Sequence, residues 1–338
     1  MTLNTASGAV SCWVLSDGRA GIEAQALGLA EALGTDPAVK RLTARRPWVW
    51  LPPRMWLRPL VCVEVREGGP VAPPWPDIVI SSGRRAAAVS AAVGAAARRA
   101  GARTFAIHIQ RPYLPLDRFD LVVAPRHDRL TGANVLATLG ALGRVTPARL
   151  ATAAEDLAPE TLAAIAALPR PRIAVAVGGS SRVFRFGRDE AQALAQRLRQ
   201  AQVGTGGSLL VTVSRRTGRP VAELLRRALA DLPGRFYDGC GAENPAENPY
   251  LAFLGLADAI VVTGDSVNMA SEAAATGKPV HIFGLPGGSA KFDRFHRDLR
   301  EAGIARPFMG DIERWSYVPL AEASRIAREI QARMSGVS

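Results

Sequence analysis

The sequence predicts an α/β protein with two Rossmann-like domains whose parallel sheets face a cleft. Three observations support this prediction. The chain has 338 residues, which suits two domains of ordinary size. Apolar runs of strand length alternate with segments of helical periodicity, as in parallel sheets covered by helices on both faces. Two distant stretches, starting near residues 10 and 173, each indicate a strand, a glycine-rich turn and a helix.

The first domain is expected to cover residues 1–150. Its helices are predicted at 22–33, which ends before Gly34, and in an alanine-rich run that reaches about residue 100. Its predicted strands are the apolar runs at 10–16, 61–65, 77–81, 104–109, 121–124 and 135–139.

The second domain is expected to cover residues 151–318. Residues 144–171 hold four prolines and many alanines, and we place the interdomain connection there, with one short helix in it. Helices follow near 187–202 and 219–231. The predicted strands are 173–177, 209–213, 259–262 and 280–283. Residues 319–338 form a C-terminal helix that we expect to pack back on the first domain.

The composition is typical of a cytoplasmic protein. Hydrophobic residues make up 48% of the chain, yet no apolar run is long enough to span a bilayer. The N-terminus lacks the charged region and the cleavage pattern of a signal peptide. The cysteines at 12, 62 and 240 have neither metal-ligand spacing nor the pattern of a disulfide framework.

The net charge of +12 is concentrated in the first half. Residues 1–150 carry 19 Lys and Arg against 10 Asp and Glu, whereas the remainder carries 23 against 20. Such an excess suggests an anionic partner: a membrane surface, a phosphorylated substrate or nucleic acid. Only three of the 42 basic residues are Lys, so a genomic preference for Arg is an equally good explanation.

Two turns of the second domain have the composition of anion sites. Gly178, Gly179 and Ser180 follow a strand, and glycines let the backbone approach a phosphate near a helix start. A tight turn with helix capping would explain the same glycines. The sequence is neither a P-loop nor a dinucleotide fingerprint. In the next turn, after Ser214, the adjacent Arg215 and Arg216 can neutralise a diphosphate or form a solvated surface pair.

A third turn leads into a helix that carries an acidic residue. After Gly264, either Asp265 or Ser266 can cap the helix. The pair Ser271-Glu272 then falls in the second helical turn. A carboxylate at that place can accept hydrogen bonds from both hydroxyls of a ribose while the helix start faces phosphates. The alternative is an ordinary surface glutamate.

These turns carry a family resemblance. Residues 263–283 resemble the donor-site helix of GT-B glycosyltransferases, in which a hydroxyl-containing turn, a Ser/Thr-Glu pair and Gly-x-Pro recur. The whole chain resembles the "elongated mitochondria" family of mitochondrial fission proteins more closely. The motifs that carry this second resemblance are Leu15-Ser16-Asp17-Gly18-Arg19-Ala20-Gly21 with Gln25, Gly178-Gly179-Ser180, Ser214-Arg215-Arg216-Thr217, and Thr263-Gly264-Asp265-Ser266 with Ser271-Glu272.

The likeness to GT-B enzymes implies a nucleotide-sugar site in the second domain. Glu272 would hold the donor ribose, and Ser266, Gly179 and Ser180 would face the diphosphate. Arg215 would assist departure of the leaving group.

Arg216 is placed equally well in the sequence for that role. The scheme requires no metal and no cofactor, because arginines and helix N-termini would stabilise the leaving diphosphate. The sequence also lacks an Asp-x-Asp pair of the metal-binding kind.

The same likeness places the acceptor on the first domain. Asp17 is the candidate base that removes the acceptor's proton, and Glu23 is its reserve. The alternative is that Asp17 caps its turn with Arg19 as its charge partner. His108 is a rival base, although a lone histidine in an apolar run is more often a satisfied core residue.

Residues 41–60 are basic and aromatic, with five Arg, three Trp and no acid. Their prolines interrupt any continuous amphipathic helix. The side chains considered for contact with a membrane or a lipid acceptor are Arg45, Arg46, Trp48, Trp50 and Trp56, together with Arg19 of the first turn. The equal alternative is a loop whose tryptophans pack on the core. Single-stranded nucleic acid is disfavoured as a partner.

The expected function is therefore sugar transfer from a nucleotide-sugar donor to an envelope glycan or a lipid-linked acceptor. The protein would be cytoplasmic and peripheral to the inner membrane, with an anionic membrane surface and no nucleic acid among its partners. A non-catalytic membrane adaptor on the same scaffold is the alternative, because plant members of the resembling family are implicated in recruiting a dynamin-related protein. A nicotinamide-dependent oxidoreductase is disfavoured because its fingerprint is missing.

Overall fold

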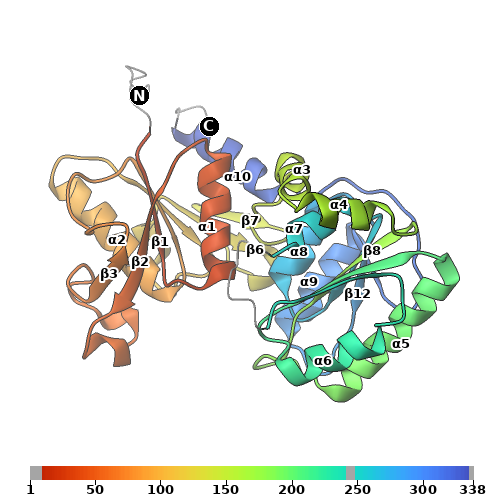
Figure 1. The fold of residues 1–338 in the computed structure, drawn as a ribbon. Helices are drawn as coiled ribbons and strands as arrows, with labels where there is room; N and C mark the ends of the chain where they lie inside the picture. The colour runs from red at the N-terminus through yellow and green to blue at the C-terminus, as the bar shows by residue number, and fades with distance from the viewer. Residues whose placement is uncertain (1–9, 241–247, 335–338) are drawn as a thin grey trace. The chain divides into compact units, whose positions relative to one another are not determined.

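The computed structural model describes residues 10–240 and 248–334. The chain forms two compact units. Residues up to Arg144, together with Ala321 onward, make the first unit, and Val145–Leu320 make the second. Each unit is a sheet with helices packed on it (Figure 1).

The first unit is built on a sheet of seven described strands in the order β3-β2-β1-β4-β5-β6-β7. Neighbouring strands are parallel, except that the edge strand β3 runs antiparallel to β2. The expectation of purely parallel strands is corrected at this edge, and antiparallel edge strands are common on such sheets. The strands are β1 (Cys12–Ser16), β2 (Ala38–Ala44), β3 (Val63–Glu67), β4 (Ile78–Ser82), β5 (Phe105–Ile109), β6 (Leu121–Pro125) and β7 (Val135–Thr138).

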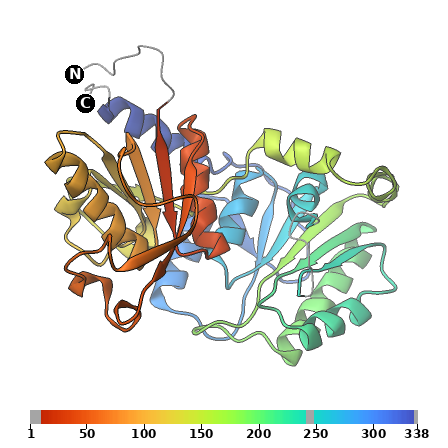
Figure 2. The same ribbon diagram turned by 60° about the vertical axis from the view of Figure 1, so that its left-hand side comes forward.

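Helices cover both faces of this first sheet. On one face, α1 (Ala20–Ala32) and α10 (Glu322–Met334) bury Leu29 and Ile330 against β1, β4 and β5. On the other face, α2 (Arg84–Arg99) buries Val89 against β4 and β5. Figure 2 shows the red α1 and the golden α2 on opposite sides of the sheet. The C-terminal helix therefore completes the core of the first unit.

The second unit is built on a sheet of six described strands in the order β10-β9-β8-β11-β12-β13. All of its neighbouring pairs are parallel. The strands are β8 (Arg172–Val177), β9 (Ser208–Val213), β10 (Gly234–Asp238), β11 (Ala259–Thr263), β12 (Val280–Phe283) and β13 (Ala305–Pro307).

Helices also cover both faces of this second sheet. On one face, Leu198 of α5 and Leu225 of α6 join a cluster with β8, β9 and Phe308. On the other face, Ile165 of α4 and Phe253 of α7 pack on Leu210. The helices are α3 (Pro147–Glu155), α4 (Pro159–Ala166), α5 (Arg188–Thr205), α6 (Arg219–Ala228), α7 (Tyr250–Leu256), α8 (Val267–Ala275) and α9 (Ala290–Glu301). Short 3-10 turns occur at 48–50, 53–55, 116–118 and 126–128.

Both sheets reverse their strand order once. In the first unit the chain adds β2 on one side of β1 and then β4 on the other. In the second unit it adds β9 on one side of β8 and then β11 on the other. Ligands of such sheets bind beyond the carboxyl ends of the strands at this reversal. The turns after β1, β8 and β11 are therefore the places where chemistry is expected.

The apolar runs that were predicted as strands are strands, whereas several other elements were not predicted. Among these, β2 alternates charged and apolar residues, and its Lys40 is buried because its ammonium donates hydrogen bonds to the carbonyls of Gly68, Gly69 and Pro70. Strands β10 and β13 and helices α7 and α9 were also not predicted. The connection at 144–171 holds two helices, α3 and α4, rather than one.

No helix among the described residues is both long enough and apolar enough to cross a bilayer.

Replacement of Ile330 by alanine tests the packing of α10. The side chain is fully buried, so we expect the free energy of unfolding to fall by about 2–5 kcal/mol in chemical denaturation. Arg328→Ala, at an exposed position of the same helix, is the matched control and should change stability by less than about 0.5 kcal/mol. Equal effects of the two substitutions would contradict this packing.

Candidate functional site

The candidate site of the second unit lies at the carboxyl ends of β8, β9 and β11. Gly178 and Gly179 follow β8, Ser214 follows β9, and Gly264 follows β11. The parallel pairing of β8 with both neighbours brings these three turns to one edge of the sheet. The sequence motifs on separate turns are thus neighbours in space.

Asp265 joins the three turns. Its side chain is fully buried, and its carboxylate accepts hydrogen bonds from the Gly179 N–H at 3.0 Å and the Thr263 hydroxyl at 2.7 Å. The guanidinium of Arg216 forms an ion pair with it at 2.8 Å. Because a buried carboxylate is costly unless it is paired, this arrangement holds the turns together.

The glycines after β8 are required by this packing. A side chain at Gly178 would place its Cβ 2.2 Å from the Asp265 carboxylate, and one at Gly179 would approach the Arg216 carbonyl to 2.1 Å. The carbonyl of Gly178 accepts hydrogen bonds from the hydroxyls of Ser214, at 3.0 Å, and Thr217. Close contact between turns therefore explains these glycines without an anion.

The loop after β8 does not lead directly into a helix. Ser180 bonds through its hydroxyl to both backbone groups of Phe186, and α5 begins only at Arg188. Glu190 caps that helix by accepting the Gly187 N–H at 2.8 Å. A carboxylate thus already occupies the positive end of α5, which disfavours a phosphate there.

The two arginines after β9 differ in their surroundings. Arg216 is held by Asp265 and also donates to the Gly179 carbonyl at 3.4 Å. Arg215 is exposed and has no ion-pair partner among residues 10–240 and 248–334. The structure thus distinguishes two residues that the sequence left equivalent.

Helix α8 starts directly after the turn that follows β11. Ser266 caps it by accepting the Met269 N–H at 3.3 Å, whereas Asp265 does not cap it. The Ser271 hydroxyl donates to the Val267 carbonyl at 2.7 Å and is buried. The first turn of a helix carries a partial positive charge, and here the capping group is a neutral hydroxyl.

Glu272 lies on α8 and is not an ordinary surface residue. It keeps a partly exposed surface, yet protein atoms surround its carboxylate closely, and this burial raises its pKa to about 7. The Tyr250 hydroxyl donates to it at 2.8 Å, which acts against this rise in pKa. Tyr250 begins α7, and no sequence pattern connects it with Glu272, so the pair was missed.

A pocket of about 470 Å³ adjoins this edge of the sheet in the second unit. His296 of α9 lies in its wall and donates from Nε2 to the Gly264 carbonyl at 2.8 Å. Burial lowers the pKa of His296, which keeps the ring neutral. Polar groups that line the pocket include Asp293, His296, Arg197, Arg300 and Arg306. Asp293, His296 and Arg300 were missed because α9 was not predicted, and Arg306 because β13 was not; Arg197 lies on the predicted helix α5, but no sequence pattern marked it as a site residue.

In the first unit, Asp17 follows β1 and Gly83 follows β4, at the corresponding reversal of strand order. The Asp17 carboxylate accepts hydrogen bonds from the Arg19 guanidinium at 2.9 and 2.5 Å. Arg19 is largely exposed, whereas the Asp17 side chain is 9% exposed. The turn therefore contains the Asp17–Arg19 ion pair that was expected if Asp17 caps its turn rather than acting as a base.

The two other candidate bases are engaged in the fold. Glu23 binds Arg41 of β2 through both carboxylate oxygens, at 3.0 and 2.8 Å, and the pKa of Glu23 is lowered as a result. His108 is fully buried, its Nδ1 lies 2.9 Å from the Ser81 hydroxyl, and burial lowers its pKa to about 3. Neither group suits proton removal from a substrate.

The basic aromatic segment is a folded loop with mixed exposure. Trp56 is buried, and its indole N–H donates to the carbonyls of Trp48 and Leu51. The expectation that Trp56 faces a membrane is therefore wrong, because the ring packs into the core behind α2. Trp48 is half-buried against the same core, whereas Trp50 is 71% exposed.

The arginines of this segment point outward. Arg45 is exposed and donates to the Val63 carbonyl at 3.0 Å, and the Arg46 guanidinium lies 5.9 Å from the Trp50 ring centre.

The described ranges contain no cluster of three or more His, Cys, Asp or Glu arranged to hold a metal ion.

Comparison with solved structures identifies the fold. UDP-GlcNAc 2-epimerase from Methanocaldococcus jannaschii is similar over 95% of this chain and 99% of its own, with a TM-score of 0.55 and 11% identity. The same enzyme in complex with UDP-GlcNAc and UDP gives a TM-score of 0.51 with the same identity and coverage. MurG from Acinetobacter baumannii is 15% identical, with coverage of 96% and 90% and a TM-score of 0.47. From the similarity to the two epimerase structures, the protein has two Rossmann-like units of the GT-B type.

Sequence comparison identifies the family. Mitochondrial fission protein ELM1 from Arabidopsis thaliana is 35% identical over 288 residues, which is 76% of this chain. The chain covers 65% of that relative's length. The family model described as "Mitochondrial fission ELM1" matches residues 20–334. The chain therefore belongs to the mitochondrial fission ELM1 family.

Proposed function

We propose that the protein is a metal-independent GT-B glycosyltransferase. It transfers a sugar from a nucleotide-sugar donor to an envelope glycan or a lipid-linked acceptor at the cytoplasmic face of the inner membrane. The observation that carries the proposal is Glu272, on the helix that starts at the reversal of strand order, with its carboxylate bound by the Tyr250 hydroxyl of α7.

The donor is bound along α8. Glu272 accepts hydrogen bonds from the ribose hydroxyls, and its position six residues after the cap corresponds to about 9 Å along the helix axis. That spacing leaves the diphosphate near Ser266 and the positive helix start. Ser271 and Asp265 hold this scaffold and do not contact the donor themselves, because their side chains are buried and bonded to protein groups.

Other groups of the second unit serve the sugar and the leaving group, and Asp17 of the first unit serves the acceptor. The pocket beside Gly264 offers room for the sugar and supplies arginines as hydrogen-bonding groups. Arg215 forms no ion pair with the residues that the structure describes, so its guanidinium can stabilise the charge that develops on the leaving diphosphate. Asp17 serves as the base for the acceptor hydroxyl once Arg19, which is largely exposed, moves away from it.

The comparisons support this proposal at the level of the fold. The epimerase whose fold is similar binds UDP-GlcNAc and UDP, which are ligands of the class proposed here. Because fold alone does not establish activity, the assignment rests on the residues of the site.

A non-catalytic adaptor is the second candidate function. The Asp17–Arg19 ion pair favours it, since the proposed base is neutralised by a neighbour two residues away. An adaptor and an enzyme differ in turnover, and both can bind a nucleotide.

Glu272→Gln tests the donor site. A panel of nucleoside diphosphates and their sugar conjugates should include one that raises the thermal midpoint of the native protein in a concentration-dependent manner. Loss of the charged Glu272 acceptor should lower the affinity for that ligand roughly 10-fold to 100-fold. Glu301→Gln, an exposed residue at the end of α9, is the control and should bind normally. If no nucleotide stabilises the native protein, the donor site is refuted.

The pH dependence of donor binding follows from the pKa of Glu272, which is about 7. The ionised carboxylate is the stronger acceptor, so affinity for the stabilising nucleotide sugar should rise from pH 6 to pH 8 and then level. The stability of the ligand-free protein should depend on pH with the opposite sign. Because the pKa of Glu272 is raised in the folded state, unfolding releases a proton between pH 4.5 and pH 7. The free energy of unfolding therefore falls as the pH rises through that window. Isothermal titration calorimetry should show a flat profile for Glu272→Gln.

The two arginines after β9 should respond differently to substitution. Arg215→Gln is expected to lower the rate of nucleoside diphosphate release from the donor by about 10²–10³-fold with no change in thermal midpoint. Arg216→Gln should lower the midpoint, because it leaves the buried Asp265 carboxylate short of a partner. The reverse pattern would exclude Arg215 as the catalytic arginine.

A further inference from the structure

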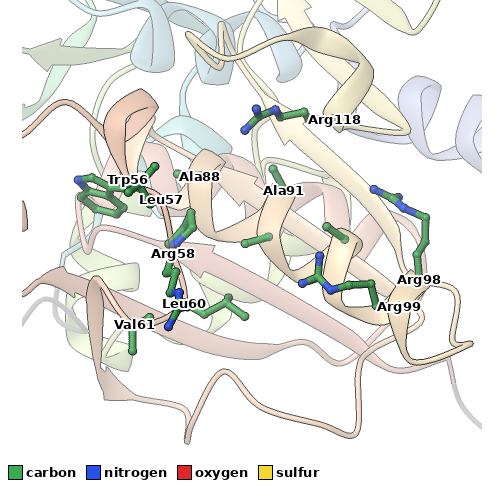
Figure 3. Close-up of a pocket in the computed structure, with 13 residues that line it drawn as sticks. Trp56, Leu57, Arg58, Leu60, Val61, Ala88, Ala91, Arg98, Arg99 and Arg118 are labelled. Atoms are coloured by element: carbon green, nitrogen blue, oxygen red, sulfur yellow. The ribbon is translucent and has the colours of Figure 1, made fainter.

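A pocket of about 520 Å³ lies in the first unit between the loop at 56–61 and helix α2 (Figure 3). One wall is the loop, and the opposite wall is the face of α2 that carries Ala88, Ala91, Ala92 and Ala95. These positions are three or four residues apart and so share one face of the helix. Their small side chains leave the space that forms the pocket.

The walls of this pocket are aliphatic, and part of the loop is strongly exposed. Leu57 is 90% exposed and Val61 is 61% exposed, and both lie in the wall. Met55, which precedes them, is also exposed. Exposed apolar side chains beside an open pocket are typical of a binding surface.

The rim of the pocket is cationic. Arg58, Arg98, Arg99 and Arg118 line it and are exposed, and no acidic residue lines it. Across the described ranges none of these four guanidinium groups forms an ion pair, in contrast to Arg41 and Arg144 of the same unit. Figure 3 shows Arg98 and Arg99 at the end of α2, beyond the alanine face.

We propose that this pocket is a lipid-binding site through which the first unit docks on an anionic membrane. The aliphatic walls take up part of an acyl chain, and the arginines bind the phosphate of the headgroup. Leu57 and Val61 enter the interfacial region of the bilayer. The ligand class is a phospholipid of net negative charge.

The chemistry of the walls favours a lipid over nucleic acid. Bases bind single-stranded sites by stacking on aromatic rings, whereas the one aromatic residue of this wall, Trp56, is buried and bonded inward. Charge complementarity with anionic headgroups accounts for the unpaired arginines. The inference does not depend on the nucleotide site, which lies in the other unit.

Vesicle flotation of the full-length protein tests the proposal. We expect binding to vesicles that contain equal parts of phosphatidylglycerol and phosphatidylcholine, and none to phosphatidylcholine alone. The double variant Arg98→Gln/Arg99→Gln should bind about 25-fold more weakly, since each arginine near an anionic surface contributes about a factor of five. Leu57→Ser should also weaken binding to the anionic vesicles.

Matched controls remove the same groups from the second unit. Arg182→Gln/Arg297→Gln deletes two exposed charges there, and Val203→Ser deletes an exposed apolar side chain. Both controls should bind vesicles as the native protein does. The thermal midpoints of all variants should match the native value, because each altered residue is exposed, and their response to nucleotides should be unchanged.

Three results would overturn the proposal. The first is no binding of the native protein to anionic vesicles. The second is an equal loss in the control pair, which would mean that total charge alone attracts the protein. The third is a normal affinity of Leu57→Ser for anionic vesicles, which would exclude insertion into the bilayer.

Discussion

The buried carboxylate of Asp265 is the interaction on which the ligand-facing edge of the second unit depends. Its donors are Gly179 after β8, Arg216 after β9 and Thr263 at the end of β11, so the loops after these three strands are held in one arrangement. A buried charge tolerates no missing partner, because the desolvation penalty then stays uncompensated. This requirement also explains Gly178 and Gly179, since any side chain there would collide with Asp265 or with the Arg216 backbone.

This constraint separates the polar residues of the edge into those that hold the turns in place and those that remain available to a ligand. Asp265, Arg216 and Ser214 bind one another or the backbone, and they position the turns. Arg215 has no ion pair with any described residue, and Glu272 keeps a raised pKa while it accepts a hydrogen bond from the Tyr250 hydroxyl. Groups that a rigid framework holds in place need little reorganisation when a charged ligand binds, which is the condition for electrostatic stabilisation.

The first unit distributes its charges in a comparable way. Glu23 and Arg41 connect α1 to β2. The Lys40 ammonium donates hydrogen bonds to the carbonyls of the turn at 68–70 and lies 4.3 Å from the Trp13 ring centre. Among residues 10–240 and 248–334, the arginines at the end of α2 have no such ion-pair partner. The positive charge of this half is therefore not spread evenly: part of it stabilises the fold, and part remains available to an anionic surface.

The sequence by itself determined the fold class, because buried parallel strands are continuous apolar runs and the turns after them carry glycine, serine and threonine. It also placed Glu272 on a helix behind such a turn. Only the tertiary structure decided that Arg216 rather than Arg215 pairs with Asp265, that Tyr250 binds Glu272, and that Trp56 is buried whereas Trp50 is exposed. The periodicity of apolar residues indicates on which face of its own helix or strand a residue lies. The partner of a charge and the burial of a loop side chain depend on segments distant in the chain, which only folding brings into contact.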